Sequence, residues 1–145
     1  MAESLKSVIR NDLNNARKDR DKLKTTVYST FLSEIRNREI ELGSEATDDD
    51  VRALLITAIK RRREAVEQMR AGGRSELADK EERESELLKA YLPPELDEAE
   101  VRSMVTAAIA AGAADLGSVM KVVMPRVRGQ FDGKELNRIV REELG

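Results

Sequence analysis

Apolar residues recur every three or four positions along most of the chain, which is the spacing that places them on one face of an α-helix. Seven segments show this pattern, and each lies between residues that start or stop helices. The predicted helices cover approximately residues 5–18, 22–42, 48–71, 76–92, 98–111, 116–128 and 133–144. No segment of useful length alternates apolar and polar residues as a β-strand does. The pattern therefore predicts an all-α, multihelical protein of about seven helices.

The predicted helix starts are polar side chains that can accept hydrogen bonds from the free N–H groups of a first turn. They are Ser4, Asp21, Thr47, Ser75, Asp97, Asp115 and Asp132. Three of these have an acidic residue three positions later, which is the spacing of a capping box. The predicted pairs are Thr47 with Asp50, Asp97 with Glu100, and Asp132 with Glu135. Glycines 43, 72 and 129 are predicted helix stops.

The helical pattern is interrupted by Pro93-Pro94 and by the acidic run Glu95–Glu100. Proline lacks a backbone N–H and disfavours helical backbone in the residue before it, so a continuous helix is not expected here. We therefore predict a boundary between two subdomains at these prolines. Residues 1–92 should form a four-helix N-terminal subdomain, and residues 95–145 a three-helix C-terminal tail.

The chain of 145 residues contains no cysteine and no histidine. This excludes disulfides, thiolate chemistry and any Ser-His-Asp arrangement, and it removes the commonest acid/base residue and metal ligand. Asp48–Asp50 fit the first turn of a helix better than a metal site, and the glycine pairs lack the strand-to-helix setting of a phosphate loop. We expect no catalytic residue, no cofactor and no metal.

No apolar run approaches 18 residues, and the first residues already mix charged and apolar side chains. A signal peptide has a different pattern, with a continuous apolar core. The sequence therefore predicts a cytoplasmic protein without a membrane partner.

A basic run, Lys60–Arg63, resembles a nucleic-acid-binding patch. If the two helices around it fold back antiparallel about the Gly-Gly turn that follows, Arg61 lies opposite Glu84 and Arg63 lies opposite Glu82. Four consecutive helical residues also point in four directions, so they do not form one patch. Pairing between helices is therefore the favoured interpretation, and a binding role is the alternative.

Beyond residue 100 the chain carries 7 Lys and Arg against 5 Asp and Glu. Six of these cations lie around the predicted corner between the last two helices: Lys121, Arg126, Arg128, Lys134, Arg138 and Arg141. The first five are the candidate RNA-binding residues. Two helix N-termini add partial positive charge there. The corner is therefore a candidate docking surface for an anionic partner. Phe131 could stack on a base there, but packing in the core is the favoured role.

Several short stretches, in this order, resemble the YqeY family and the C-terminal region of the B subunit (GatB) of glutamine-dependent aspartyl/glutamyl-tRNA amidotransferase. They are Lys60–Met69 with Gly73-Arg74, Leu77–Glu81, Tyr91-Leu92-Pro93, Gly117–Met120, Pro125, Gly129 and Asp132. The resemblance covers nearly the whole chain. It implies two all-helical subdomains, a larger N-terminal one and a three-helix tail.

The resemblance also implies a role beside tRNA, because the corresponding amidotransferase region resembles a tRNA-contacting appendage. Lys121, Arg126, Arg128 and Lys134 are the residues carried over as RNA-facing. Two cations common in the family are replaced here by Ser118 and Gln130. The implied partners are tRNA and components of an amidotransferase or an aminoacyl-tRNA synthetase, with no DNA.

The function expected from this resemblance is that of a non-catalytic, tRNA-associated accessory protein linked to carbon-nitrogen ligase systems that use glutamine as amido donor. An alternative is a helical protein-interaction module that makes no RNA contact. A third reading, an amidotransferase in its own right, would need amidase Ser and Lys machinery and a nucleotide site, neither of which is recognisable.

Overall fold

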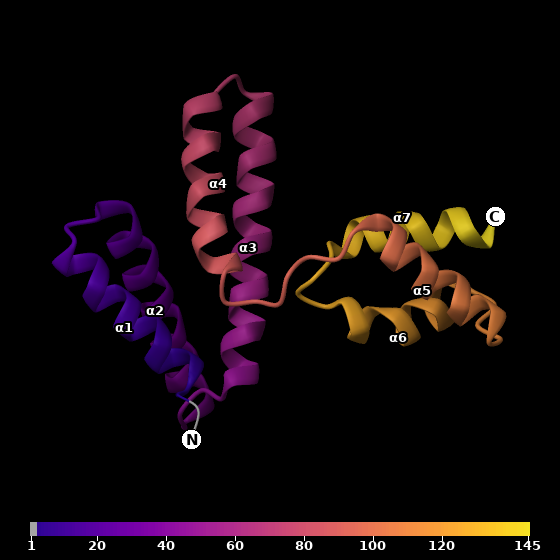
Figure 1. The fold of residues 1–145 in the computed structure, drawn as a ribbon, viewed down its shortest axis with the longest axis horizontal. Helices are drawn as coiled ribbons and strands as arrows, with labels where there is room; N and C mark the ends of the chain where they lie inside the picture. The colour runs from indigo at the N-terminus through magenta and orange to yellow at the C-terminus, as the bar shows by residue number, and fades with distance from the viewer. Residues whose placement is uncertain (1–2) are drawn as a thin grey trace. The chain divides into compact units, whose positions relative to one another are not determined.

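The computed structural model describes residues 3–145 (Figure 1). The helices are α1 (Leu5–Lys18), α2 (Lys22–Leu42), α3 (Asp48–Ala71), α4 (Ser75–Lys89), α5 (Glu98–Ala110), α6 (Leu116–Val127) and α7 (Gly133–Leu144). Across the described residues there are seven helices and no strand, which confirms the all-α prediction. Within the same range, no helix is both long and apolar enough to cross a lipid bilayer.

The chain divides into two compact units. The first, here called the N-terminal unit, contains α1–α4 and ends at Leu92, and the second, the tail unit, spans Pro93–Gly145 and contains α5–α7. Each unit has its own apolar core.

The N-terminal unit consists of two helical hairpins, α1 with α2 and α3 with α4 (Figure 1). Its buried core residues are Ile9, Leu13, Ala16, Val27, Tyr28, Phe31, Ile35, Val51, Leu55, Ala58, Ile59 and Leu88. Most of them recur three or four positions apart within a helix, which is why the apolar pattern located the helices. Aliphatic side chains supply most of this core.

Tyr91, just after α4, connects the two hairpins. Its hydroxyl donates a hydrogen bond to Asp12 on α1, and its ring meets that of Tyr28 on α2 edge-on, with centroids 6.1 Å apart and planes at 69°. Burial and the hydrogen bond to Asp12 raise the pKa of Tyr91 above its usual range. A polar contact and an aromatic contact therefore hold the end of α4 against α1 and α2.

The tail unit is a three-helix bundle. Its buried core residues are Val101, Val105, Ala108, Val119, Val123, Val127, Leu136, Ile139 and Val140. Phe131 is half-buried and packs against this cluster, so its predicted role in the core is confirmed.

Most of the predicted helix caps are present. Ser4, Asp21 and Asp115 each accept a hydrogen bond from the backbone N–H three residues later. Two complete capping boxes form, Thr47 with Asp50 and Asp97 with Glu100. At the helix ends, Gly43 and Gly129 adopt the left-handed backbone predicted for them, with φ of 72° and 81°.

Two predicted caps differ from the structure. The N-cap of α4 is Arg74 rather than Ser75, and no side chain caps that helix. Asp132 is the N-cap residue of α7, but its side chain does not accept from the helix N–H groups. The expected capping box is absent because the carboxylate of Glu135 accepts hydrogen bonds from Arg138 instead, at 2.9 and 3.1 Å.

Leu77 is one of the large apolar residues of α4, yet its side chain is 48% exposed. The buried positions of α4 include Ala78, Ser85 and Leu88, which are seven and three residues apart and share one face. Leu77 lies about 100° around the helix from Ala78, so it points to solvent.

The expected pairing between α3 and α4 is wrong in detail. Arg62, not Arg61, lies against Glu84, with its Nη1 2.5 Å from Glu84 Oε2 and 3.2 Å from Glu81 Oε2. Glu81 and Glu84 are three residues apart and face α3 together, so they bracket a single guanidinium. Arg61 is exposed, because an interface between two helices admits only about one residue per turn.

We predict that Arg62→Met lowers the free energy of unfolding by about 3 kcal/mol, because it leaves a largely buried Glu84 without its charge partner. Arg61→Met, its matched neighbour, should change that free energy by less than about 0.5 kcal/mol. Urea denaturation followed by circular dichroism measures both. Equal effects of the two substitutions would contradict the pairing seen here.

We also predict that fragments 1–92 and 93–145 each form helices alone, because each contains a separate apolar core. Circular dichroism of the two fragments checks this. Helicity that returns only when the fragments are mixed would mean that the two cores depend on each other.

Candidate nucleic-acid interface

Arg102 on α5 and Arg138 on α7 lie in one network of glutamates. Glu98 and Glu142 each contact both guanidinium groups, for example at 3.0 Å from Arg102 to Glu142 and 2.7 Å from Arg138 to Glu142. Hydrogen bonds from Arg138 and Arg102 hold the pKa of Glu98 below its usual range, and the same two residues lower the pKa of Glu142. The network links α5 to α7.

This network includes Arg138, one of the five candidate RNA-binding cations that the sequence places at the corner. Its guanidinium contacts three carboxylates, those of Glu98, Glu135 and Glu142. These contacts neutralise the charge and fix the side chain. Arg138 therefore belongs to the α5–α7 contact, and we leave it out of the candidate interface.

The other four candidate cations differ from Arg138, because they have no carboxylate partners among the described residues. Lys121, Arg126 and Arg128 lie on or directly after α6, and Lys134 is the second residue of α7. All four are exposed. Among residues 3–145, none of their side chains has an ion-pair or hydrogen-bond partner. Their positive charges are therefore available to an external anion.

Helix geometry places part of this set on one surface. α6 buries three valines along one face: Val119, Val123 and Val127. Lys121 and Arg128 are seven residues apart, which is two turns, and they lie on the opposite face with Pro125 between them. Arg126 lies about 140° around the helix from Lys121, at the edge of the buried valine face, so it is exposed on another side of α6. We call Lys121, Arg126, Arg128 and Lys134 the α6 cations.

The first turn of α7 packs against the last turn of α6, which brings Lys134 to the same corner. A Cβ atom built on Gly133 would lie 3.5 Å from the methyl carbon of Met124 on α6. Lys134 follows Gly133 directly, beside the free N–H groups at the start of α7. These groups carry partial positive charge, so they reinforce the lysine.

Gln130 holds the corner in place. Its side-chain amide donates to the carbonyl of Pro94 at 3.2 Å, and its own carbonyl accepts from the N–H of Leu96 at 2.8 Å. The residue thus ties the segment before α5 to the turn between α6 and α7.

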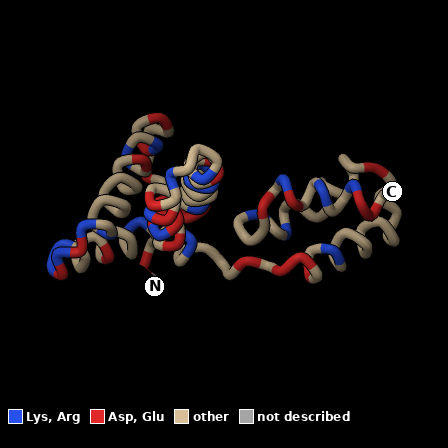
Figure 2. Tube along the Cα trace, turned by 90° about the horizontal axis from the view of Figure 1, so that it is seen from above, with Lys and Arg blue, Asp and Glu red and all other residues tan. Residues whose placement is uncertain are grey.

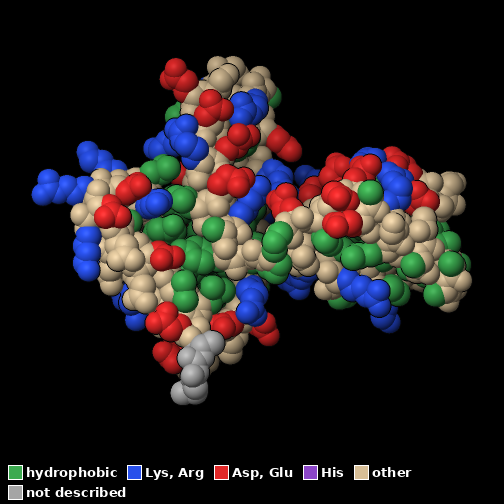
Figure 3. Space-filling view, viewed as in Figure 1, with side chains coloured by type: hydrophobic (Ala, Val, Ile, Leu, Met, Phe, Trp, Pro, Cys, Tyr) green, Lys and Arg blue, Asp and Glu red, His purple; other side chains and the backbone are tan. Residues whose placement is uncertain are grey.

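Figure 3 shows how the charges of the tail unit are distributed. Along the α6 edge, blue side chains lie beside green hydrophobic ones with little red, whereas the opposite edge mixes red and blue. Val122, 43% exposed on α6, is among the hydrophobic side chains of this unit that face solvent. The α6 edge therefore combines positive charge with some apolar surface.

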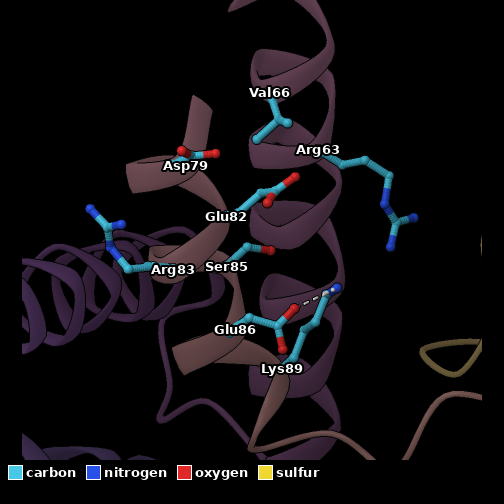
Figure 4. A pocket seen from close by; sticks show the side chains of 8 residues that line it. All are labelled: Arg63, Val66, Asp79, Glu82, Arg83, Ser85, Glu86 and Lys89. Atoms are coloured by element: carbon cyan, nitrogen blue, oxygen red, sulfur yellow. Dashed lines mark hydrogen bonds and ion pairs between the residues drawn. The ribbon is translucent and has the colours of Figure 1, made fainter. Parts of the chain in front are cut away.

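A separate hollow of about 520 Å³ lies between α3 and α4. Its lining residues are Arg63, Val66, Asp79, Glu82, Arg83, Ser85, Glu86 and Lys89. Three cations and three carboxylates balance each other there, and Figure 4 shows Arg63 and Arg83 extending away in opposite directions. Nothing converges on a ligand, so we assign this hollow no site.

The chain belongs to the YqeY-like protein family, which matches residues 6–144. The resemblance read from the sequence is thereby confirmed. An uncharacterized protein of Schizosaccharomyces pombe is 38% identical over 90 residues, which cover 62% of this chain and 73% of that protein.

Two further relatives are both named altered inheritance of mitochondria protein 41, mitochondrial. The one from Saccharomyces cerevisiae is 27% identical over 133 residues, which cover 90% of this chain and 71% of the relative. The one from Lachancea thermotolerans is 33% identical over 104 residues, which cover 68% of this chain and 54% of that relative.

Among the described residues of the present chain, no group of His, Cys, Asp or Glu could hold a metal ion.

We predict that acid weakens the tail unit through the α5–α7 network. The folded-state pKa values of Glu98 and Glu142 are lowered, so the unfolded chain takes up protons first as the pH falls. The stabilisation is complete above the ordinary glutamate pKa of about 4.3 and disappears as the pH falls through the lower folded values.

Urea denaturation followed through the NMR signals of α7, between pH 6 and pH 3, measures this loss. Arg138→Gln should flatten the pH dependence, because the lowered pKa values of both glutamates depend on Arg138. Arg141→Gln is the control, since Arg141 contacts Asn137 rather than the network. A pH dependence identical in both variants would show that the network does not stabilise the tail unit.

Proposed function

We propose that this protein is a non-catalytic tRNA-associated accessory protein whose tail unit contacts tRNA through the α6 cations. The observation that carries the proposal is the contrast within one small unit. Arg102 and Arg138 lie among carboxylates, whereas Lys121, Arg126, Arg128 and Lys134 are exposed and have no charge partner among the described residues.

Unpaired surface cations of this kind suit a phosphate backbone. When such a cation contacts a phosphate, the condensed counterion is released, so the affinity is high at low salt and falls as salt rises. A cation already paired with a glutamate contributes much less binding free energy, because it must break that ion pair before it can contact a phosphate. The α6 cations need no such exchange.

The link to amide transfer rests on family resemblance. The chain supplies no cysteine or histidine, and none of its residues carries an arrangement suited to acid/base or nucleophilic chemistry. We therefore place phosphorylation and amide transfer on a partner, a component of a tRNA-dependent amidotransferase or an aminoacyl-tRNA synthetase, in the cytoplasm. In this proposal the present chain contributes binding only.

An alternative is a helical protein-interaction module without RNA contact. Val122 favours it, because an apolar side chain 43% exposed beside Pro125 could contact a partner helix. Salt dependence separates the two functions. Apolar contacts are nearly insensitive to salt, whereas RNA affinity should fall with a log–log slope of about −0.9 per phosphate contact on duplex.

We predict that changing all four α6 cations to glutamine weakens binding of a fluorescein-labelled tRNA transcript by at least about tenfold near 0.1 M salt, and reduces the salt slope by about two or more. Folding should be retained because all four side chains are exposed and unpaired. Fluorescence anisotropy measures the binding, and circular dichroism measures the fold.

The matched control removes four exposed cations from α2, α3 and α4: Arg36, Lys60, Arg61 and Lys80. It changes the net charge by the same amount as the α6 variant. If both variants lose the same affinity, only net charge matters and the α6 surface is not a site. Tight tRNA binding by the α6 variant with an unchanged salt slope would reject the proposal.

A further inference from the structure

A second group of cations lies at the turn between α1 and α2, far along the chain from the α6 cations. Residues 17–24 contain five cations and two aspartates. The cations are Arg17, Lys18, Arg20, Lys22 and Lys24, and all five are exposed. Among residues 3–145, none of these side chains has an ion-pair or hydrogen-bond partner. We call them the turn cations.

The backbone of this turn is tightly defined. The N–H of Asp21 donates to the carbonyl of Ala16 at 2.9 Å, and the N–H of Arg20 donates to that of Arg17 at 3.2 Å. This pair of hydrogen bonds is the Schellman motif that ends many helices. Asp21 then caps α2 by accepting from the N–H of Lys24. The turn therefore holds its side chains on a rigid frame.

Arg20 occupies a strained position in this motif. Its φ is 58°, and it is the one non-glycine residue with positive φ that the described backbone contains. The Schellman motif usually places glycine there, because a side chain with a Cβ atom disfavours the left-handed region. Gly73 and Gly112 fill this position after α3 and α5, with the same pair of hydrogen bonds. An arginine here costs conformational energy that a glycine would avoid.

Strain of this kind, together with an exposed and unpaired guanidinium, indicates that the charge of Arg20 serves binding rather than folding. The surrounding residues support this reading. In Figure 2 the turn between α1 and α2 is mainly blue, and in Figure 3 blue side chains project from this end of the N-terminal unit. The two aspartates do not neutralise the five cations.

We propose that the turn cations form a second contact for the phosphate backbone of RNA. Each guanidinium or ammonium group would contact a phosphate oxygen, without reading base sequence. This inference rests on the proposed function and deepens it, because it gives the N-terminal unit a contact with the same RNA.

Other polyanions fit the turn less well. A membrane-binding segment combines cations with exposed Leu, Phe or Trp that enter the lipid. The large hydrophobic side chains that the described chain exposes are Ile40, Leu42, Leu77 and Val122. None of them lies in the turn. Base stacking is also not expected, because residues 14–26 contain no aromatic side chain.

The first experiment compares three variants of the full chain for binding of the labelled tRNA transcript. The turn variant carries Arg17→Gln, Lys18→Gln, Lys22→Gln and Lys24→Gln, and it is measured beside the α6 variant and the matched control. We expect the turn variant to lose about tenfold or more in affinity near 0.1 M salt, with a salt slope smaller by about two to three. The matched control should lose much less.

The second experiment uses Arg20 alone. Arg20→Gly should hold or raise the melting temperature, because it removes the strain at positive φ, yet it should weaken tRNA binding several-fold. Arg20→Lys should retain most of the binding, because it keeps the charge. A lower melting temperature for Arg20→Gly with unchanged tRNA affinity would show that Arg20 is structural, and it would overturn the inference.

The outcomes separate the two proposals. If the turn variant binds tRNA like the matched control while the α6 variant binds weakly, the turn inference fails and the proposed function stands. If the reverse holds, the α6 assignment fails and the turn is the RNA contact. If the unmodified chain binds vesicles containing phosphatidylserine but not the tRNA transcript, both RNA proposals fail.

Discussion

Ion pairing between neighbouring helices decides which charges this protein presents to its surroundings. The chain has 26 Lys and Arg and 28 Asp and Glu, so its net charge of −2 conceals large local differences. Where two helices meet, an arginine lies between glutamates, as Arg62 does in the N-terminal unit and Arg138 does in the tail unit. These cations are part of the fold. The remaining cations form the surface available to a partner.

This division shows where a chain without cysteine or histidine can still offer a binding surface. Small aliphatic cores hold each unit, and charged faces cover them. On two of these faces the cations lack partners among the described residues, at the α6 edge and at the turn between α1 and α2. In the two proposals each of these faces contacts an RNA phosphate, and a second contact made by the same chain is intramolecular once the first has formed.

Much of the fold could be predicted from the sequence, because helix formation depends on local spacing. Apolar residues at intervals of three and four located every helix, and short polar side chains marked most starts, including the capping box at Thr47 and Asp50. The wrong prediction at the start of α7 arises because one side chain had two possible hydrogen-bond partners. Glu135 was expected to cap α7, but a guanidinium gives it stronger, charge-assisted hydrogen bonds.

The candidate site was less predictable, because it depends on how helices face each other. Arg138 and Lys134 are four residues apart and share a face of α7, yet only Arg138 lies at the level of Glu98, the first residue of α5. Likewise Arg61 and Arg62 are neighbours, and the rotation of α3 alone decides which of them meets Glu84. The turn cations lie between two predicted helices, and the apolar spacing that located those helices assigns them no role. The density of charge in residues 17–24 was visible, but the positive φ of Arg20 was not.

The central claim is that the α6 cations and the turn cations, and not the paired arginines, contact RNA. The most direct test is an NMR titration of the full chain, labelled with ¹⁵N and ¹³C, with a tRNA transcript, following the side-chain signals of its arginines and lysines. The account predicts that the signals of the α6 cations and the turn cations shift at low RNA concentration, while those of Arg62, Arg102 and Arg138 stay in place. Shifts confined to the paired arginines, or spread equally over all cations, would contradict it.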